Sequence, residues 1–170
     1  NSVKESVKNH YLIVSRLVQY KKVHLVLRAF NKLNRKLIVI GTGREENYLE
    51  SIANENISFL GKVTDKELAR YYLKAKALIF PQEEDFGLVP IEAQSFGTPV
   101  IAYKKAGALE TVVENKTGVF FDFQEENSII EAIKQFESMT FSRKVIINNS
   151  KRFSFDNFKT NLLKIINEQL

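Results

Sequence analysis

The stretch "ALIFPQEEDFGLVPIEAQSFGTPVIAY" (residues 77–103) holds two short apolar runs separated by a segment with helix signals. The runs at 77–80 and 99–103 are bounded by Pro, Gly or polar residues, which is typical of strands buried on both faces. Pro90 suits the first turn of a helix, where its missing N–H costs nothing, and Gly97 suits the helix end. The stretch therefore predicts a strand–helix–strand unit.

The same pattern repeats on either side of this unit. Further apolar runs lie at residues 11–15, 36–41, 57–61 and 118–122. Apolar residues at helical spacing lie between the runs: Val23, Val26, Leu27, Phe30 and Leu33; Leu68, Tyr71, Tyr72 and Ala75; Ile129, Ile130, Ile133 and Phe136. Alternating strands and helices predict parallel strands joined by right-handed crossovers. We expect an α/β fold, a Rossmann-like parallel six-stranded sheet with helices on both faces.

The chain divides into three expected parts. Residues 1–10 are polar and lack an initiator Met, so we interpret them as a linker from a missing N-terminal domain. Residues 11–153 hold the strands and helices of the sheet. Residues 154–170 form a C-terminal helix with Phe155 and Phe158 on one apolar face, continued by Leu162 and Ile166, and we expect part of that face to pack on the missing domain.

Composition narrows the class of protein. The 170 residues suit one domain, and the absence of Cys excludes disulfides and thiolate metal sites. We interpret His10 and His24 as ordinary surface or strand-edge residues. The net charge of +5 is spread along the chain without the basic stripe and aromatic interleaving of nucleic-acid proteins. No apolar run reaches membrane-span length. These features favour a cytoplasmic protein.

Ligands of parallel sheets bind outside the carboxyl ends of the strands. At one such end, Glu84 and Glu92 stand astride a turn, with seven residues between them. Glu92 is expected in the first turn of the helix, where a carboxylate complements the helix dipole, and Glu84 suits a solvated loop. The alternative is that both accept hydrogen bonds from hydroxyls. "DFG" at 85–87 occurs without the other kinase motifs, so we do not interpret it as a magnesium site.

Two cations follow the first strand, at Arg16 and Lys21. Each alone suits a solvated surface, but together they form a credible diphosphate clamp, since Arg supplies a fixed fork and Lys a point charge. Gly87 would open a helix N-terminus, which is a further anion site. Carboxylates beside a diphosphate would serve the hydroxyls of a ribose or a sugar.

Five blocks carry a resemblance: "SRLVQYKKVHLVLRAF", "LIVIGTG", "ISFLGKV", "ALIFPQEEDFGLVPIEAQSFGTPVIAY" and "GALETVVENKTGVFF". In order and spacing they resemble the C-terminal, donor-binding domain of retaining GT-B glycosyltransferases of family 4 (group 1). Within that family the chain is most similar to mannosyltransferase-like enzymes of bacterial surface-polysaccharide synthesis. The resemblance implies transfer of a sugar from a nucleotide-diphospho-sugar to an acceptor hydroxyl, in surface polysaccharide or glycolipid synthesis.

The resemblance also implies residue roles. The catalytic set is Arg16 and Lys21, which would hold the diphosphate and stabilise the leaving group, with Glu84 on the donor sugar. The remaining donor-binding set is Phe86, Gly87 and Leu88 through backbone amides, Glu92 on the ribose, and Val63 and Asp65 near the nucleobase. Lys22 and Ala106 depart from the family, because many relatives have Gly at each position.

The implied donor is a GDP- or UDP-sugar, and neither a metal nor another cofactor is expected. The acceptor would bind the missing N-terminal domain, so we expect this fragment to be inactive alone. The full-length enzyme could contact the inner face of the membrane peripherally.

Other functions on the same fold remain open at this stage. A non-catalytic nucleotide-binding module is the main alternative, because a doubly wound sheet permits it. A dinucleotide dehydrogenase would need G-x-G-x-x-G after the first strand, where "SRLVQY" stands, and a Walker loop is absent. A pyridoxal-phosphate sugar phosphorylase would need a cofactor lysine, for which no candidate has supporting context.

Overall fold

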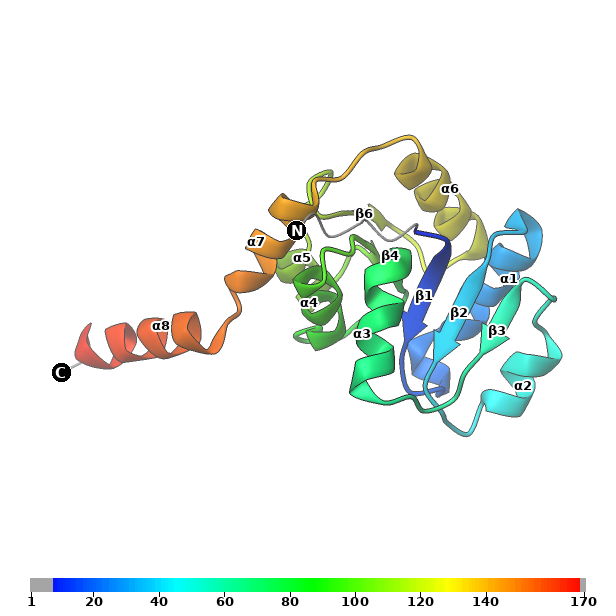
Figure 1. Cartoon of the computed structure of the whole chain (residues 1–170), viewed down its shortest axis with the longest axis horizontal. Coiled ribbons are helices and arrows are strands. Elements are labelled where there is room, and N and C mark those ends of the chain that lie inside the picture. The colour runs from blue at the N-terminus through cyan, green and yellow to red at the C-terminus, as the bar shows by residue number, and fades with distance from the viewer. Residues whose placement is uncertain (1–7, 169–170) are drawn as a thin grey trace.

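The computed structural model describes residues 8–168 and contains a six-stranded parallel sheet in the order β3-β2-β1-β4-β5-β6 (Figure 1). The strands are β1 (His10–Val14), β2 (Leu37–Ile40), β3 (Ile57–Phe59), β4 (Ala75–Phe80), β5 (Val100–Tyr103) and β6 (Gly118–Phe121). All six predicted strands are confirmed within two residues at each end, and so is the α/β class. Apart from His10 and Lys76, the residues of β1, β2, β4 and β5 are apolar, and almost all of them are buried, as expected for strands covered on both faces.

Helices cover both faces of the sheet (Figure 1). They are α1 (Val23–Leu33), α2 (Glu46–Ser51), α3 (Asp65–Lys74), α4 (Leu88–Ser95), α5 (Gly107–Thr111), α6 (Glu126–Glu137), α7 (Arg143–Lys151) and α8 (Phe155–Glu168), with a 3-10 turn η1 (Gln19–Lys21). One core cluster joins the sheet to α1, α2 and α6, and a second joins it to α3, α4 and α5. The three predicted amphipathic stripes belong to α1, α3 and α6 and face these clusters.

The winding of the chain reverses at β1, which determines where a ligand can bind. β1 pairs with β2 in the register Ile13↔Val39 and with β4 in the register Leu12↔Leu78. The chain winds outward from β1 in one direction through β2 and β3, and in the other through β4, β5 and β6. In open parallel sheets the crevice at such a reversal, beyond the carboxyl ends of the strands, is the usual ligand site.

Three local predictions need correction. α4 begins at Leu88 after Gly87 (φ 76°), so Glu92 is the fifth helical residue and lies beyond the first turn. Gly87 opens the helix, as predicted, and adopts the left-handed conformation that other residues avoid. Ala75 begins β4 instead of continuing α3. His10 was interpreted as a surface or strand-edge residue, and its burial as the first residue of β1 excludes the surface position. Gly97, at φ 76°, ends α4 as predicted.

α8 extends away from the sheet (Figure 1). Its predicted apolar face is confirmed as a stripe, but Phe155 (75% exposed), Phe158, Leu162 and Ile166 are all solvent-exposed. A cover for this face by another domain stays a prediction. Residues 1–7 of the predicted linker lie outside the described residues. Within residues 8–168, every helix falls short of the length and apolar character that a membrane crossing demands.

Candidate functional site

The turn after β1 carries both predicted clamp cations. Arg16 is exposed just beyond the strand, whereas Lys21 ends η1 and is only 8% exposed. Lys22 then adopts φ 56° and ψ 23°, a left-handed residue that turns the chain into α1. The αL region strains a residue with a Cβ, which explains why Gly is favoured at this position.

Lys21 forms an ion pair with Glu84, the first of the two predicted carboxylates. Two segments more than 60 positions apart therefore converge at the carboxyl edge of β1 and β4. Burial, followed by the positive charge of Arg16, lowers the pKa of Lys21. Arg16 is thus near enough to act on Lys21 electrostatically, and an anion bound between the two cations would relieve their repulsion.

The loop that carries Glu84 is fixed by its backbone. The Gly107 N–H donates to the Glu84 carbonyl at 2.8 Å. A Cβ on Gly107 would lie 2.6 Å from the carbonyl oxygens of Asp85 and Phe86, so only glycine allows the two loops this approach. Gln82 is buried and its Nε2 lies 3.5 Å from Glu84 Oε2, while its Oε1 lacks a hydrogen-bond partner among the described residues.

Ala106, next to this contact, has a strained backbone. Its φ of 49° and ψ of −135° belong to a region that glycine occupies readily and alanine does not. Lys22 and Ala106 both have a positive φ, so a glycine, which the resemblance implies at each position, would be unstrained there. The strain lies one residue from the amide that holds Glu84.

Glu92 is held apart from the Lys21–Glu84 pair by its own partner. Its Oε2 accepts a hydrogen bond of 3.0 Å from the Tyr72 hydroxyl of α3, while the Glu92 side chain remains exposed. Burial and the neighbouring carboxylate of Glu92 raise the pKa of Tyr72, so the phenol stays a donor. Glu92 is therefore oriented and still has acceptor capacity toward solvent.

The three residues of the "FGL" segment form the start of α4. Phe86 is half-exposed and meets Phe153 edge-on at 6.1 Å, Gly87 is buried, and Leu88 is 70% exposed. The first four N–H groups of an α-helix lack partners within the helix. The α4 N-terminus therefore presents donors and positive dipole beside Glu84.

Val63 lies in the turn between β3 and α3, and Asp65 is the first residue of α3, at the same edge of the sheet. Thr64 caps α3 with a full capping box, in which Thr64 accepts from the Glu67 N–H and Glu67 accepts from the Thr64 N–H. Asp65 is exposed in the first helical turn, where the dipole alone also explains it. Its nearness to a nucleobase stays a prediction.

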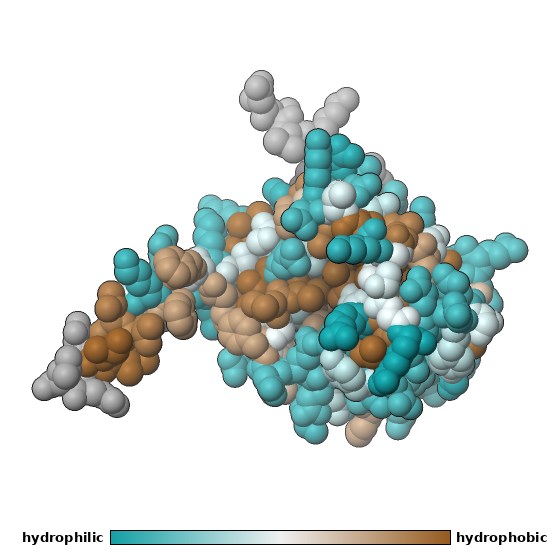
Figure 2. Space-filling model, turned by 90° about the horizontal axis from the view of Figure 1, so that it is seen from below, coloured by the Kyte–Doolittle hydropathy of each residue, from teal (hydrophilic) through white to brown (hydrophobic). Residues whose placement is uncertain are grey.

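A hollow of about 550 Å³ opens beside Arg16. It is lined also by Tyr20 and by the "GTGR" loop after β2, including Thr42 and Arg44. The strand arrows of β1 and β2 point to the lower side of Figure 1, and from below the surface is hollowed between hydrophilic side chains (Figure 2). Arg16, one of the two predicted clamp cations, thus borders an open space of ligand size, whereas Lys21 is not among the residues that line it.

The structure adds three contacts that the sequence did not predict: Tyr72 on Glu92, Gln82 on Glu84, and the Gly107 amide on the Glu84 carbonyl. Tyr72 was predicted only as part of an apolar stripe, and its hydroxyl gives no pattern signal. Gly107 had one weak signal, a glycine directly after a strand and its polar loop. Gln82 had none.

Comparisons with known proteins show the family and the fold of the chain. The family model described as "Glycosyl transferases group 1" matches residues 1–153. An uncharacterized glycosyltransferase of Methanocaldococcus jannaschii is 29% identical over 177 residues, covering 94% of this chain and 45% of the relative. The capsular polysaccharide biosynthesis glycosyltransferase CapM of Staphylococcus aureus is 30% identical over 162 residues, covering 88% of this chain and 42% of CapM.

A solved structure shares the fold. Anabaena HepE, crystallised in complex with UDP and glucose, is 21% identical, with a TM-score of 0.69 over 95% of this chain and 48% of that one. The chain spans less than half the length of these three proteins.

Proposed function

Because the chain belongs to the group 1 glycosyl transferases, we propose that its carboxyl edge binds the nucleotide-diphospho-sugar donor of a retaining glycosyltransferase. The observation that carries the proposal is the convergence of Arg16, Lys21 and Glu84 at the reversal point of the sheet. Two cations and a carboxylate at one spot match a ligand with an anionic diphosphate and a neutral polyhydroxylated sugar. GDP and UDP are the nucleotides we propose, and the complex of HepE with UDP supports the second.

Each part of the donor then has a place. The diphosphate lies between Arg16 and Lys21 and over the α4 N-terminus, where the backbone amides of Phe86, Gly87 and Leu88 begin the helix. Glu84 accepts from sugar hydroxyls beside it. In this arrangement Lys21 lies between its Glu84 partner and the phosphate, and both anions stabilise the ammonium.

The nucleoside occupies the neighbouring positions. Glu92, oriented by Tyr72, accepts from the ribose hydroxyls, and the β3–α3 turn with Val63 and Asp65 borders the base. These placements are part of the proposal and follow from the family resemblance.

The proposed reaction breaks the bond between the anomeric carbon and the donor phosphate oxygen, and the electron pair leaves with the diphosphate. The acceptor hydroxyl oxygen forms the new bond on the same face, and its proton passes to the leaving phosphate oxygen. Arg16, Lys21 and the helix N–H groups would stabilise the charge that develops on the leaving group. Glu84 would bind hydroxyls and form no covalent intermediate, and no metal or other cofactor is proposed.

The family and CapM support a role of the whole protein in building a surface polysaccharide or glycolipid. The acceptor would bind a part of the protein outside this chain, which is consistent with the chain's coverage of under half of its relatives.

Calorimetry with a nucleoside diphosphate and the matching nucleoside tests the clamp. Arg16→Ala and Lys21→Ala should each weaken binding of the nucleoside diphosphate at least tenfold, because a charged hydrogen bond contributes about 1.5–3 kcal/mol. Binding of the nucleoside should be unchanged. Lys66→Ala, an exposed lysine of α3, is the matched control. Equal losses for both ligands would contradict the clamp.

Glu84→Gln separates sugar binding from phosphate binding. It removes a negative charge from the immediate neighbour of Lys21, so affinity for the nucleoside diphosphate should hold or rise. Affinity for the nucleotide-sugar should fall relative to the diphosphate, because the charged acceptor for sugar hydroxyls is lost. A parallel loss for both ligands would show that Glu84 only positions Lys21.

A further inference from the structure

A second hollow lies at the opposite, amino edge of the sheet, away from the donor site. It has a volume of about 650 Å³ and is lined by the starts of β1 and β4, the loop before β2, and the segment 139–141 between α6 and α7. In Figure 1 this edge is at the top, where the α6–α7 connection crosses. Volumes of this size accommodate small-molecule ligands.

The floor of the hollow is apolar and well packed. Tyr11 is 1% exposed and meets the Phe136 ring edge-on at 6.2 Å, and Phe136 stacks on Phe141 at 5.0 Å. Met139 and Pro99 complete the apolar part. An apolar group of a ligand would lose its water on this floor, which is the main favourable term in small-molecule binding.

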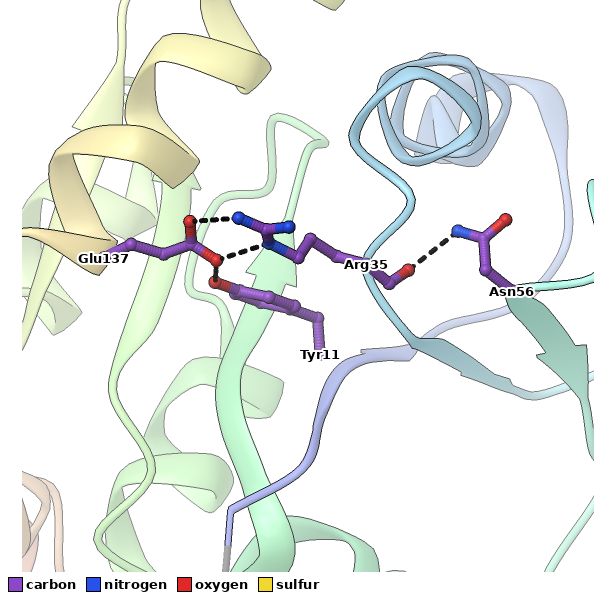
Figure 3. Close-up of polar contacts among 4 residues, drawn as sticks. All are labelled: Tyr11, Arg35, Asn56 and Glu137. Carbon is purple, nitrogen blue, oxygen red and sulfur yellow. Dashed lines mark hydrogen bonds and ion pairs between the residues drawn. The ribbon is translucent and has the colours of Figure 1, made fainter.

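The rim of the hollow is cationic. Among the described residues that line it are three cations, Lys8, Arg35 and Lys76, and a single carboxylate, Glu137. Glu137 is already committed. It accepts from the Tyr11 hydroxyl at 3.0 Å and from Arg35 Nε and Nη2 at 2.9 and 3.1 Å (Figure 3). The hydrogen bonds from Arg35 hold the pKa of Glu137 below its usual value, so this carboxylate and Arg35 neutralise each other.

Arg35 is held in place, and together with Lys76 it gives the hollow more positive charge than Glu137 can neutralise. Asn56 donates to the Arg35 carbonyl at 2.7 Å, which anchors the loop (Figure 3). Lys76 lies 5.9 Å from the Tyr11 ring centroid, and within residues 8–168 no carboxylate lies within ion-pair distance of it. The charge of Lys76 adds to that of Arg35 in lowering the pKa of Glu137, so this one carboxylate faces two cations, and the excess positive charge above the aromatic floor is suited to an anion.

We propose that this hollow binds a small phosphorylated molecule that carries an apolar ring or chain, with the phosphate on Lys76, Lys8 and Arg35 and the apolar part on Phe136, Met139 and Phe141. Phosphate fits because it offers charge to several separate donors at once. A single small molecule fits better than a membrane surface, since the apolar residues lie at the buried floor, where a flat bilayer does not reach. The site does not depend on the donor site.

Amide NMR titration of the 170-residue chain with phenyl phosphate, inorganic phosphate and phenol tests the proposal. Phenyl phosphate should shift the amides of residues 139–141 and bind tighter than either inorganic phosphate or phenol. Lys76→Gln should weaken phenyl phosphate roughly tenfold, the effect of one charged hydrogen bond, and Lys76→Arg should retain most of the affinity. Lys66→Gln on exposed α3 is the control and should change nothing.

Three outcomes would overturn the proposal. The first is that phenyl phosphate shifts only the amides of residues 16–21 at the donor edge. The second is that Lys76→Gln binds phenyl phosphate with unchanged affinity. The third is that phenyl phosphate does not bind, while phosphatidylglycerol vesicles bind in a way that needs Lys76. UDP added in parallel should shift residues 16–21 and leave 139–141 in place, so a failure here is distinct from a failure of the donor site.

Discussion

Ala106→Gly should stabilise this chain, against the general rule that glycine destabilises. Ala106 adopts φ 49° and ψ −135°, a conformation that costs a residue with a Cβ on the order of 1–3 kcal/mol and costs glycine almost nothing. The change removes that strain from the folded state. It also widens the unfolded ensemble, which typically costs about 0.4–1 kcal/mol.

The balance is a net gain of roughly 0.5–2 kcal/mol in the free energy of unfolding. For a domain of this size, 1 kcal/mol corresponds to roughly 2–4 °C in Tm, so Tm should rise by about 1–8 °C. Urea unfolding should show a higher midpoint with an unchanged slope, because the surface exposed on unfolding stays the same.

Ala69→Gly is the matched control, since Ala69 lies inside α3 with helical backbone. There the same substitution should destabilise by about 1 kcal/mol. A fall in the urea midpoint for Ala106→Gly, comparable to that of Ala69→Gly, would refute the strain at Ala106.

Three further predictions concern ligand binding, pH and transfer. In calorimetry, Glu92→Gln should reduce the binding free energy of a ribonucleotide by about 1.5–3 kcal/mol and that of its 2′-deoxy analogue by much less. Equal losses for the two ligands would show that Glu92 serves only its contact with Tyr72. Burial lowers the pKa of His10 from 6.5 to about 4, so the unfolded chain binds this proton first and stability should fall as pH drops from 6.5 toward 4. The slope reaches up to about 1.4 kcal/mol per pH unit, and urea midpoints at pH 7 and 5 should lie closer together in His10→Phe if this reasoning holds. The isolated chain should bind a labelled nucleotide-sugar without transferring the sugar to any acceptor, and robust transfer would refute the need for a further domain.

Much of the candidate site was predictable, because its residues follow strand ends. Arg16 and Lys21 come directly after β1, Glu84 follows β4, and the carboxyl ends of parallel strands share one edge. The position of Glu92 within α4 was predicted wrongly, since Pro90 suggested the helix start. Gly87 does open α4, as its own prediction had it, so Glu92 is the fifth helical residue.

Residues whose role depends on a distant partner gave no local signal. The Tyr72 hydroxyl meets Glu92 across 20 positions, and Tyr11 meets Glu137 across 126. In sequence each tyrosine is simply an apolar residue at strand or helix spacing.

By itself, the sequence determined the six parallel strands, the helices between them and the edge at which we propose that a ligand binds. Hydrophobic period and turn residues act over a few positions and need no knowledge of the rest of the chain. Only the tertiary structure decided that Lys21 meets Glu84, that Ala106 is strained beside the Gly107 amide, and that Arg35 and Lys76 border a hollow at the far edge. Those features depend on how segments far apart in the chain are brought together by packing, and side-chain charge and backbone strain acquire their meaning only there.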